Sequence, residues 1–299
     1  MLEVTSPFDG EHLKPDERWL VLRGDRRLEE QVRGLAGRRM VFFAGLPGTG
    51  KSLLVHQLAH VAHALGKTVH LLQWDVARPV FEASPAGRRF PLVDGVTHAV
   101  IRKAAGLWVR RALVGWSERH PGPEHLLVGE VPLIGGRFIE FARPLDDGAE
   151  RLLADPSCRF VITVPSADVR RFLEAERERR AVRPLHPRER EDAPPHVLRD
   201  LWRDLIEVGR RLGVVVSSAD YDPAVYQQVY ARVLCHRTVE PVALDVILPT
   251  GGLSVYDFAL VPADLTPSHA ESETCIQEVE RRYPDAAVLE REVARWWDV

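Results

Sequence analysis

The stretch "MVFFAGLPGTGKSLLVHQLAH", residues 40–60, joins an apolar run to a glycine-rich turn and then to a helix-like segment. Its turn, GLPGTGKS, fits the complete pattern GxxxxGK[ST]. Glycines in this pattern let successive backbone N–H groups turn inward around an anion, and the following helix directs its positive end at the same place. Residues 40–44 have the length of a strand, and apolar residues then recur at helical spacing. The stretch therefore predicts a strand, a phosphate-binding loop and a helix.

Eight residues form the predicted nucleotide-binding loop: Gly45, Leu46, Pro47, Gly48, Thr49, Gly50, Lys51 and Ser52. We expect Lys51, as a solvated lysine at the mouth of the loop, to reach the β- and γ-phosphates of a nucleoside triphosphate. The Ser52 hydroxyl is the expected ligand of a magnesium ion that bridges those phosphates. The predicted ligands are therefore ATP or GTP, together with Mg²⁺.

Composition and charge disfavour several classes of protein. Forty basic and 43 acidic residues in a chain of 299 give a formal charge of −3, so overall charge favours neither nucleic acid nor an acidic membrane as a partner. Cys158, Cys235 and Cys275 match no disulfide or zinc spacing and fit a reducing compartment. The first residues lack a secretory pattern, and no apolar run has spanning length. We expect a soluble, cytoplasmic protein with no membrane partner.

Four further segments have the pattern of strands separated by helices: KTVHLLQWD (67–75), EHLLVGE (124–130), CRFVITV (158–164) and GVVVSS (213–218). This alternation predicts an α/β fold with a parallel sheet that carries helices on both faces. In such sheets, ligands bind beyond the carboxyl ends of the strands. That rule selects the glycine-rich loop, Asp75 with Arg78, Glu130, and Pro165 with Ser166.

The same pattern divides the chain into three parts. Residues 1–38 are an N-terminal extension with a predicted helix over 25–35, and residues 39–220 are the core. Residues 221–299 are a C-terminal appendage with a predicted helix at 222–234, strand-like stretches at 241–248 and 253–260, and a charged helical tail.

The residues that follow the second and third strands separate the classes of nucleotide-binding protein. Motor ATPases usually end the third strand with paired carboxylates, whereas here a single Glu130 precedes Val131 and Pro132. GTP switches usually carry an NKxD-type guanine reader, which this sequence lacks. Asp75 and Arg78 form a DxxR pair that shares one face if Asp75 opens a helix. Asp75 can then accept the proton of an attacking hydroxyl while Arg78 holds an anionic acceptor group.

Residues 40–213 resemble the P-loop kinases, most of all the polynucleotide kinases that phosphorylate 5′-hydroxyls. The resemblance rests on the glycine-rich Walker A loop and on the DxxR pair one strand later. Zeta toxins and adenylylsulfate kinases share the plan less closely. The resemblance implies a P-loop NTPase fold with a helical lid and Asp75 as general base; Lys51 and Arg78 complete the predicted catalytic set. The alternative for this pair is a helix N-cap and a solvated arginine.

An alternative remains for the role of Glu130 and for the role of the basic segment at about 168–200. Glu130 is predicted to bind magnesium through water, or else to be a surface carboxylate after a buried strand. Residues at about 168–200 look like a kinase lid, because two helices are joined by a basic connection that prolines interrupt. The lid arginine candidates are Arg177, Arg180, Arg183 and Arg188. The alternative is a solvated helix whose Glu and Arg side chains pair with one another.

The predicted function is that of a kinase, an ATP- or GTP-dependent transferase that moves the γ-phosphate to a hydroxyl. Its acceptor is a nucleic acid 5′ end or a small metabolite. A regulatory NTP-binding protein or an ATPase without a hydroxyl acceptor is the alternative. His56, His60 and His63 have no cysteine or carboxylate at ligand spacing, so packing or surface positions are expected for them.

Overall fold

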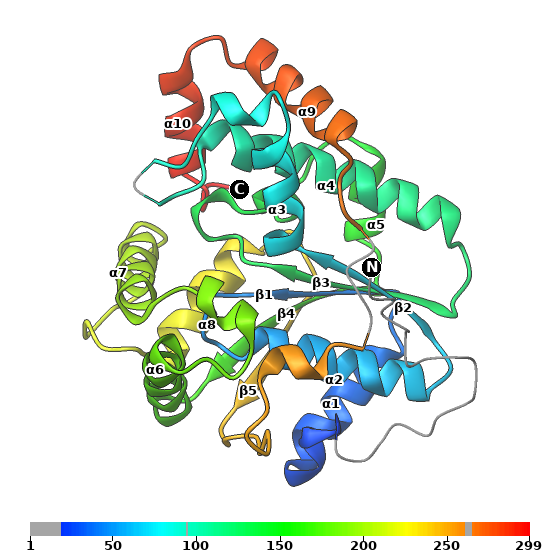
Figure 1. Ribbon diagram of the computed structural model, residues 1–299, viewed down its shortest axis with the longest axis vertical. Coiled ribbons are helices and arrows are strands. Elements are labelled where there is room, and N and C mark those ends of the chain that lie inside the picture. Colours follow the sequence, from blue (N-terminus) through cyan, green and yellow to red (C-terminus); the bar gives the residue numbers. More distant parts are fainter. Residues whose placement is uncertain (1–18, 94, 261–264) are drawn as a thin grey trace, which may run out of the picture.

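Figure 1 shows the computed structural model of the chain, which describes residues 19–93, 95–260 and 265–299. Residues 1–18 of the predicted N-terminal extension lie outside the described residues. Five strands form one parallel sheet: β1 (Met40–Ala44), β2 (Thr68–Gln73), β3 (His125–Val131), β4 (Cys158–Pro165) and β5 (Val239–Leu244). Their order across the sheet is β2-β3-β1-β4-β5. The predicted α/β class with a parallel sheet is confirmed.

Helices separate and flank the strands. They are α1 (Arg26–Ala36), α2 (Lys51–Ala64), α3 (Trp74–Ala83), α4 (Ala99–Arg119), α5 (Gly148–Leu153), α6 (Ala167–Val182), α7 (Pro195–Arg211), α8 (Pro223–Val233), α9 (His269–Arg282) and α10 (Ala286–Ala294). Helix α1 matches the helix predicted at 25–35, and Asp25 begins it by accepting a 3.1 Å hydrogen bond from the Leu28 N–H. Within the described ranges, no helix combines the length and apolar composition needed to cross a bilayer.

The sheet is buried on both faces, as Figure 1 shows for the helices above and below it. Phe42 and Phe43 of β1 are both fully buried, although their side chains point to opposite faces. Phe43 belongs to the cluster under α1 and α2, whereas Phe42 belongs to the larger cluster under α4, α7, α8, α9 and α10. Two buried faces explain why these strands are nearly continuous apolar runs in the sequence.

Two of the predicted strands are wrong. Residues 213–218 have no regular structure, and Val215 is 85% exposed. The fifth strand is β5, which overlaps the strand-like stretch predicted at 241–248 in the expected C-terminal appendage and pairs with β4. Its edge position tolerates Pro241, a residue that weakens the strand pattern in the sequence. Residues 255–258, predicted as part of a strand, form the short 3₁₀ helix η7 (Val255–Phe258), which Ser254 caps.

A pair of valine substitutions tests which segment belongs to the sheet. Val242 in β5 is fully buried against the α1 and α2 side of the core. We expect Val242→Ala to lower the free energy of unfolding by about 2 kcal/mol, because two methyl groups leave the core and a cavity remains. Val215→Ala should change it by less than about 0.5 kcal/mol. Urea unfolding measures both, and equal effects would contradict the assignment of β5.

Candidate functional site

A cavity of about 1410 Å³ opens beyond the carboxyl ends of the central strands. Its floor is the glycine-rich loop between β1 and α2, and one wall is the start of α3 together with the end of β3. The opposite wall consists of α6, α7 and the short 3₁₀ helix η6 (Pro187–Glu191) between them, with residues from 244–256 closing the remaining side. The cavity thus lies beyond the carboxyl ends of the parallel strands, at the edge that the strand rule selects.

The glycine-rich loop has backbone angles that residue types other than glycine rarely adopt. Gly48 and Gly50 have φ angles of +70° and +80°, and Gly50 is the N-cap of α2. Gly45 has a φ of +147°, and a Cβ atom there would lie 2.1 Å from the Tyr226 hydroxyl oxygen. That hydroxyl accepts a 3.2 Å hydrogen bond from the Leu46 N–H, and burial raises the pKa of Tyr226 to about 12. Tyr226 therefore supports the loop as a neutral hydroxyl.

Arg170 of α6 holds the loop from the other side. Its guanidinium Nη1 donates to the carbonyl oxygens of Pro47 at 2.9 Å and Gly48 at 3.0 Å, while Nε donates to Glu174 at 2.7 Å. The residue is only 2% exposed. These hydrogen bonds to the loop carbonyls anchor the loop to the first turns of α6. Sequence reasoning missed both Arg170 and Tyr226, since neither belongs to a local motif.

Lys51, Ser52 and Glu130 meet at the base of the cavity. The Lys51 Nζ donates to the Leu46 carbonyl at 2.7 Å and lies 3.4 Å from a Glu130 carboxylate oxygen. The Ser52 hydroxyl donates to the other Glu130 oxygen at 3.0 Å. The expectation of a solvated Lys51 is wrong, because the residue is 4% exposed. Burial lowers the pKa of Lys51, and the Glu130 carboxylate opposes that shift.

Asp75 and Arg78 lie in the first turns of α3 and both line the cavity. Arg78 forms a 3.0 Å ion pair with Glu82, one turn further along the helix. Asp75 is accessible to solvent through the cavity, yet protein atoms surround it. That partial desolvation raises the pKa of Asp75, and the negative charge of Glu130 adds to the increase. The two residues share one helix end, as the DxxR spacing predicts.

Arg137 is a further cavity residue that sequence reasoning missed. It lies in a turn after β3 in which the non-glycine residues Leu133 and Phe138 have φ angles of +63° and +59°. Such conformations cost on the order of 1–3 kcal/mol each and are concentrated at functional sites. Burial lowers the pKa of Arg137, and the nearby Asp75 carboxylate opposes that shift. The adjacent glycines of the sequence, residues 135 and 136, were the available signal of an unusual turn.

All four predicted lid arginines line the cavity. Arg177 pairs with Asp192, and Arg180 pairs with the buried Glu189 at 2.7 Å. Arg188 lies over the ring of Tyr256, with 4.7 Å between the guanidinium carbon and the ring centroid. Arg183 is the exposed C-cap of α6. The predicted pair of helices with a proline-broken connection is confirmed, although three of its arginines have side-chain partners.

The histidines of α2 are packing or surface residues, as expected. His56 is buried, and this burial lowers its pKa to about 4. His60 is buried beside the Phe258 carbonyl at 2.9 Å, whereas His63 is exposed.

The predicted residues Lys51, Ser52, Asp75, Arg78 and Glu130 therefore converge on one cavity, although they come from three separate segments. No protein-family model, curated protein or solved structure matches the chain. Function is accordingly inferred from the geometry and chemistry of the cavity itself.

Substitutions at two glycines test the packing of the loop. Gly45→Ala adds a methyl group against Tyr226, so we expect a loss of more than about 3 kcal/mol in the free energy of unfolding. Gly66→Ala is the control, since Gly66 also has a positive φ, +78°, but no atom lies within 4 Å of an added Cβ. It should cost about 1–2 kcal/mol.

Denaturant unfolding in a Tyr226→Phe background completes that test. Removal of the hydroxyl should reduce the cost of Gly45→Ala by about 1 kcal/mol or more, because the closest atom is gone. An identical cost in both backgrounds would show that the two residues do not touch.

Proposed function

We propose that the chain is an NTP-dependent phosphotransferase with the architecture of a P-loop kinase. The observation that carries this proposal is the convergence of a glycine-rich loop, Lys51 and Ser52 with Asp75 and Arg78 on one cavity. In this proposal the N–H groups of the loop and the N-terminus of α2 hold the phosphates of the nucleotide. Lys51 leaves its contacts with Leu46 and Glu130 to neutralise charge on the β- and γ-phosphates.

The residues at the loop fit a magnesium ion. Ser52 and Glu130 supply a hydroxyl and a carboxylate that already lie 3.0 Å apart, and Mg²⁺ prefers such oxygen ligands. Ser52 would bind the ion directly and Glu130 through water. The ion supplies charge neutralisation on the phosphate oxygens when it is bound. Glu130 also accepts the hydrogen bond of Ser52 and so orients that hydroxyl.

Asp75 is the proposed general base. The acceptor oxygen attacks the γ-phosphorus, the bond to the bridging oxygen of the nucleoside diphosphate breaks, and the hydroxyl proton passes to Asp75. A raised pKa suits this role, since a carboxylate of ordinary pKa is a weak base. Arg78 and Arg137 line the cavity together with Asp75 and are the proposed ligands of an anionic group on the acceptor.

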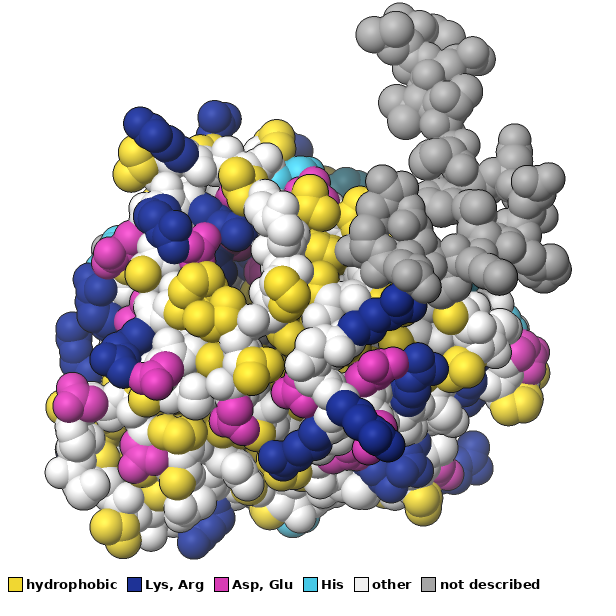
Figure 2. All heavy atoms as spheres, turned by 90° about the horizontal axis from the view of Figure 1, so that it is seen from below, with side chains coloured by type: hydrophobic (Ala, Val, Ile, Leu, Met, Phe, Trp, Pro, Cys, Tyr) yellow, Lys and Arg dark blue, Asp and Glu magenta, His cyan; other side chains and the backbone are white. Residues whose placement is uncertain are grey.

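The size and surface of the cavity bear on the acceptor. A volume of about 1410 Å³ exceeds the usual range for a single small ligand, so a nucleotide and an acceptor fit together. On the face drawn in Figure 2, basic, acidic and apolar side chains are interspersed among the described residues. The charged side chains that line the cavity are likewise of both signs, unlike the basic groove that tracks a nucleic acid backbone. A small anionic metabolite is the acceptor we favour over a polynucleotide 5′ end.

A second candidate is an NTP-hydrolysing regulatory protein without a hydroxyl acceptor. The observation that favours it is the carboxylate of Glu130 beside Ser52, which can orient water as well as magnesium. The two candidates differ in their dependence on Asp75, because hydrolysis directed by Glu130 has no need of a base on α3.

Loss of the Lys51 charge should weaken nucleotide binding. Lys51→Met keeps the buried stem but removes the ammonium, so we expect calorimetry to show roughly 10- to 100-fold weaker binding of Mg-ATP or Mg-GTP. Lys67→Met is the matched control, because Lys67 follows the opposite end of α2 and its Nζ donates to the Arg38 carbonyl at 3.0 Å, away from the cavity. Undiminished binding by Lys51→Met would refute the assignment of the loop.

Transfer of labelled γ-phosphate tests the catalytic base. A screen of hydroxyl-bearing metabolites and 5′-hydroxyl oligonucleotides identifies the acceptor, and Asp75→Asn should then reduce transfer by about 100- to 10,000-fold at saturating nucleotide. The wild-type rate should fall as the pH drops through the raised pKa of Asp75, because only the ionised carboxylate accepts a proton. This acidic limb should disappear in Asp75→Asn.

Asp168→Asn is the control for that substitution. Asp168 also lies in the first turn of a helix that follows a strand, but its side chain is 83% exposed and outside the cavity. It should keep the wild-type rate. If Asp75→Asn hydrolyses nucleotide normally and no acceptor is found, the regulatory alternative replaces the kinase.

A further inference from the structure

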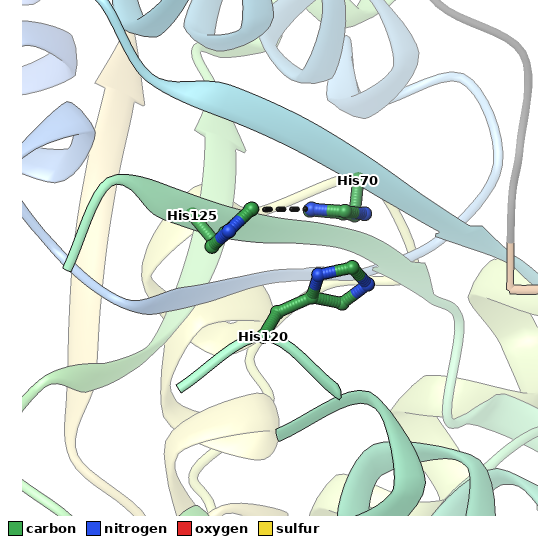
Figure 3. Close-up of side chains that lie close together, drawn as sticks. All are labelled: His70, His120 and His125. Atoms are coloured by element: carbon green, nitrogen blue, oxygen red, sulfur yellow. Dashed lines mark hydrogen bonds between the residues drawn. The ribbon is translucent and has the colours of Figure 1, made fainter. Parts of the chain in front are cut away.

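Three histidines lie together near the amino ends of β2 and β3, at the other end of the sheet from the cavity (Figure 3). His70 is the third residue of β2, His125 begins β3, and His120 is the C-cap of α4. Glu130 is five residues further along β3 than His125, a separation of roughly 17 Å in an extended strand. The cluster is therefore distinct from the proposed phosphotransfer site.

The fold brings these residues together in two ways. Thr68 pairs with His125 across the sheet, so His70, two residues beyond Thr68, lies on the same face as His125. The short connection Pro121-Gly122-Pro123 then returns the chain from His120 to β3. As a result the ring centroids are 4.3 to 5.2 Å apart, and the Trp116 ring packs at 5.7 Å from that of His70.

The nitrogen atoms have the spacing of metal ligands. One ring nitrogen from each histidine lies within 4.8 Å of the other two, and the His70 Nε2 is 3.0 Å from the His125 Nδ1. A tetrahedral zinc ion with Zn–N bonds of about 2.0–2.1 Å separates its nitrogen ligands by roughly 3.4 Å. The 3.0 Å contact is a hydrogen bond, so a bound ion would replace the proton that His70 and His125 share, and the three rings would turn toward it.

The Glu124 carboxylate lies beside one of these histidines, His125. The His125 Nε2 lies 3.4 Å from the Glu124 carboxylate, which favours the tautomer with its proton on Nε2. In that tautomer the Nδ1 lone pair points toward His70. This relation between carboxylate, imidazole and ion recurs in protein zinc sites, where the outer carboxylate orients the ring.

We propose that His70, His120 and His125 bind one divalent transition-metal ion of the zinc class, with water in the fourth position. Three neutral imidazoles suit zinc and its neighbours, whereas magnesium prefers oxygen ligands. The positive charge of Arg39, whose guanidinium donates to the His125 carbonyl at 2.8 Å, opposes cation binding, and the nearby Glu124 offsets it. The ion would join β2, β3 and the end of α4, which are separate in sequence.

Calorimetric titration of the full chain with zinc, and absorption spectroscopy with cobalt(II), test the proposal. We expect saturable binding of one ion per chain, visible cobalt bands of tetrahedral intensity, and a higher Tm with zinc than without it. Magnesium should produce none of these. His120→Ala should weaken zinc binding at least about 100-fold, because even the loss of an outer-shell partner costs 10- to 100-fold. Glu124→Gln should weaken it about tenfold.

The control is His63→Ala, which removes an exposed histidine from α2 and should leave zinc affinity unchanged. His125→Gln and His120→Gln are measured in parallel, so that a folding defect in one variant does not decide the outcome. Absence of saturable zinc binding to the wild-type chain would overturn the proposal. Equal affinity in the wild type and in folded variants at positions 120 and 125 would overturn it too. Because the readout is metal binding, it is independent of phosphate transfer.

Discussion

The contact between Arg170 and the glycine-rich loop is the interaction on which the rest of the cavity depends. A loop that turns its N–H groups toward a ligand leaves carbonyl groups pointing into protein, where an unpaired acceptor is costly. Arg170 satisfies two of these carbonyls, at Pro47 and Gly48, with one nearly buried guanidinium. Since Arg170 belongs to α6, the same helix that anchors the loop also carries one wall of the cavity.

The charges around the cavity are arranged by this framework. Asp75 follows β2 and Glu130 is the next-to-last residue of β3, and the repulsion between them adds to the desolvation that raises the pKa of Asp75. Lys51 lies between the loop and Glu130, where its ammonium pairs with that carboxylate. Glu130 therefore lies beside a cation, whereas Asp75 is desolvated and has a raised pKa. The two carboxylates are in different environments. This difference supports the separate roles proposed for them, a magnesium ligand and a base.

Local patterns predicted the elements whose residues are contiguous. Strand β1, the loop and α2 form one unbroken stretch, and the first turns of α3 contain both Asp75 and Arg78. The fifth strand was misassigned because β propensity competes with position in the fold. Residues 213–218 have the stronger strand pattern, but after α6 and α7 they leave the sheet without pairing, whereas residues 239–244 pair in parallel with β4. The weaker segment, with its Pro241, therefore occupies the sheet edge.

The sequence by itself determined the strand, glycine loop and helix, and the placement of Lys51, Ser52, Asp75 and Glu130 at strand ends. These follow from backbone conformation and from the direction of parallel strands, both of which are encoded over a few neighbouring residues. Only the tertiary structure decided which distant side chains complete the two clusters: Arg137, Arg170 and Tyr226 at the cavity, and the three histidines at the opposite end of the sheet. Their proximity arises from strand register and helix packing, which bring together residues too far apart in the chain for any local pattern to connect.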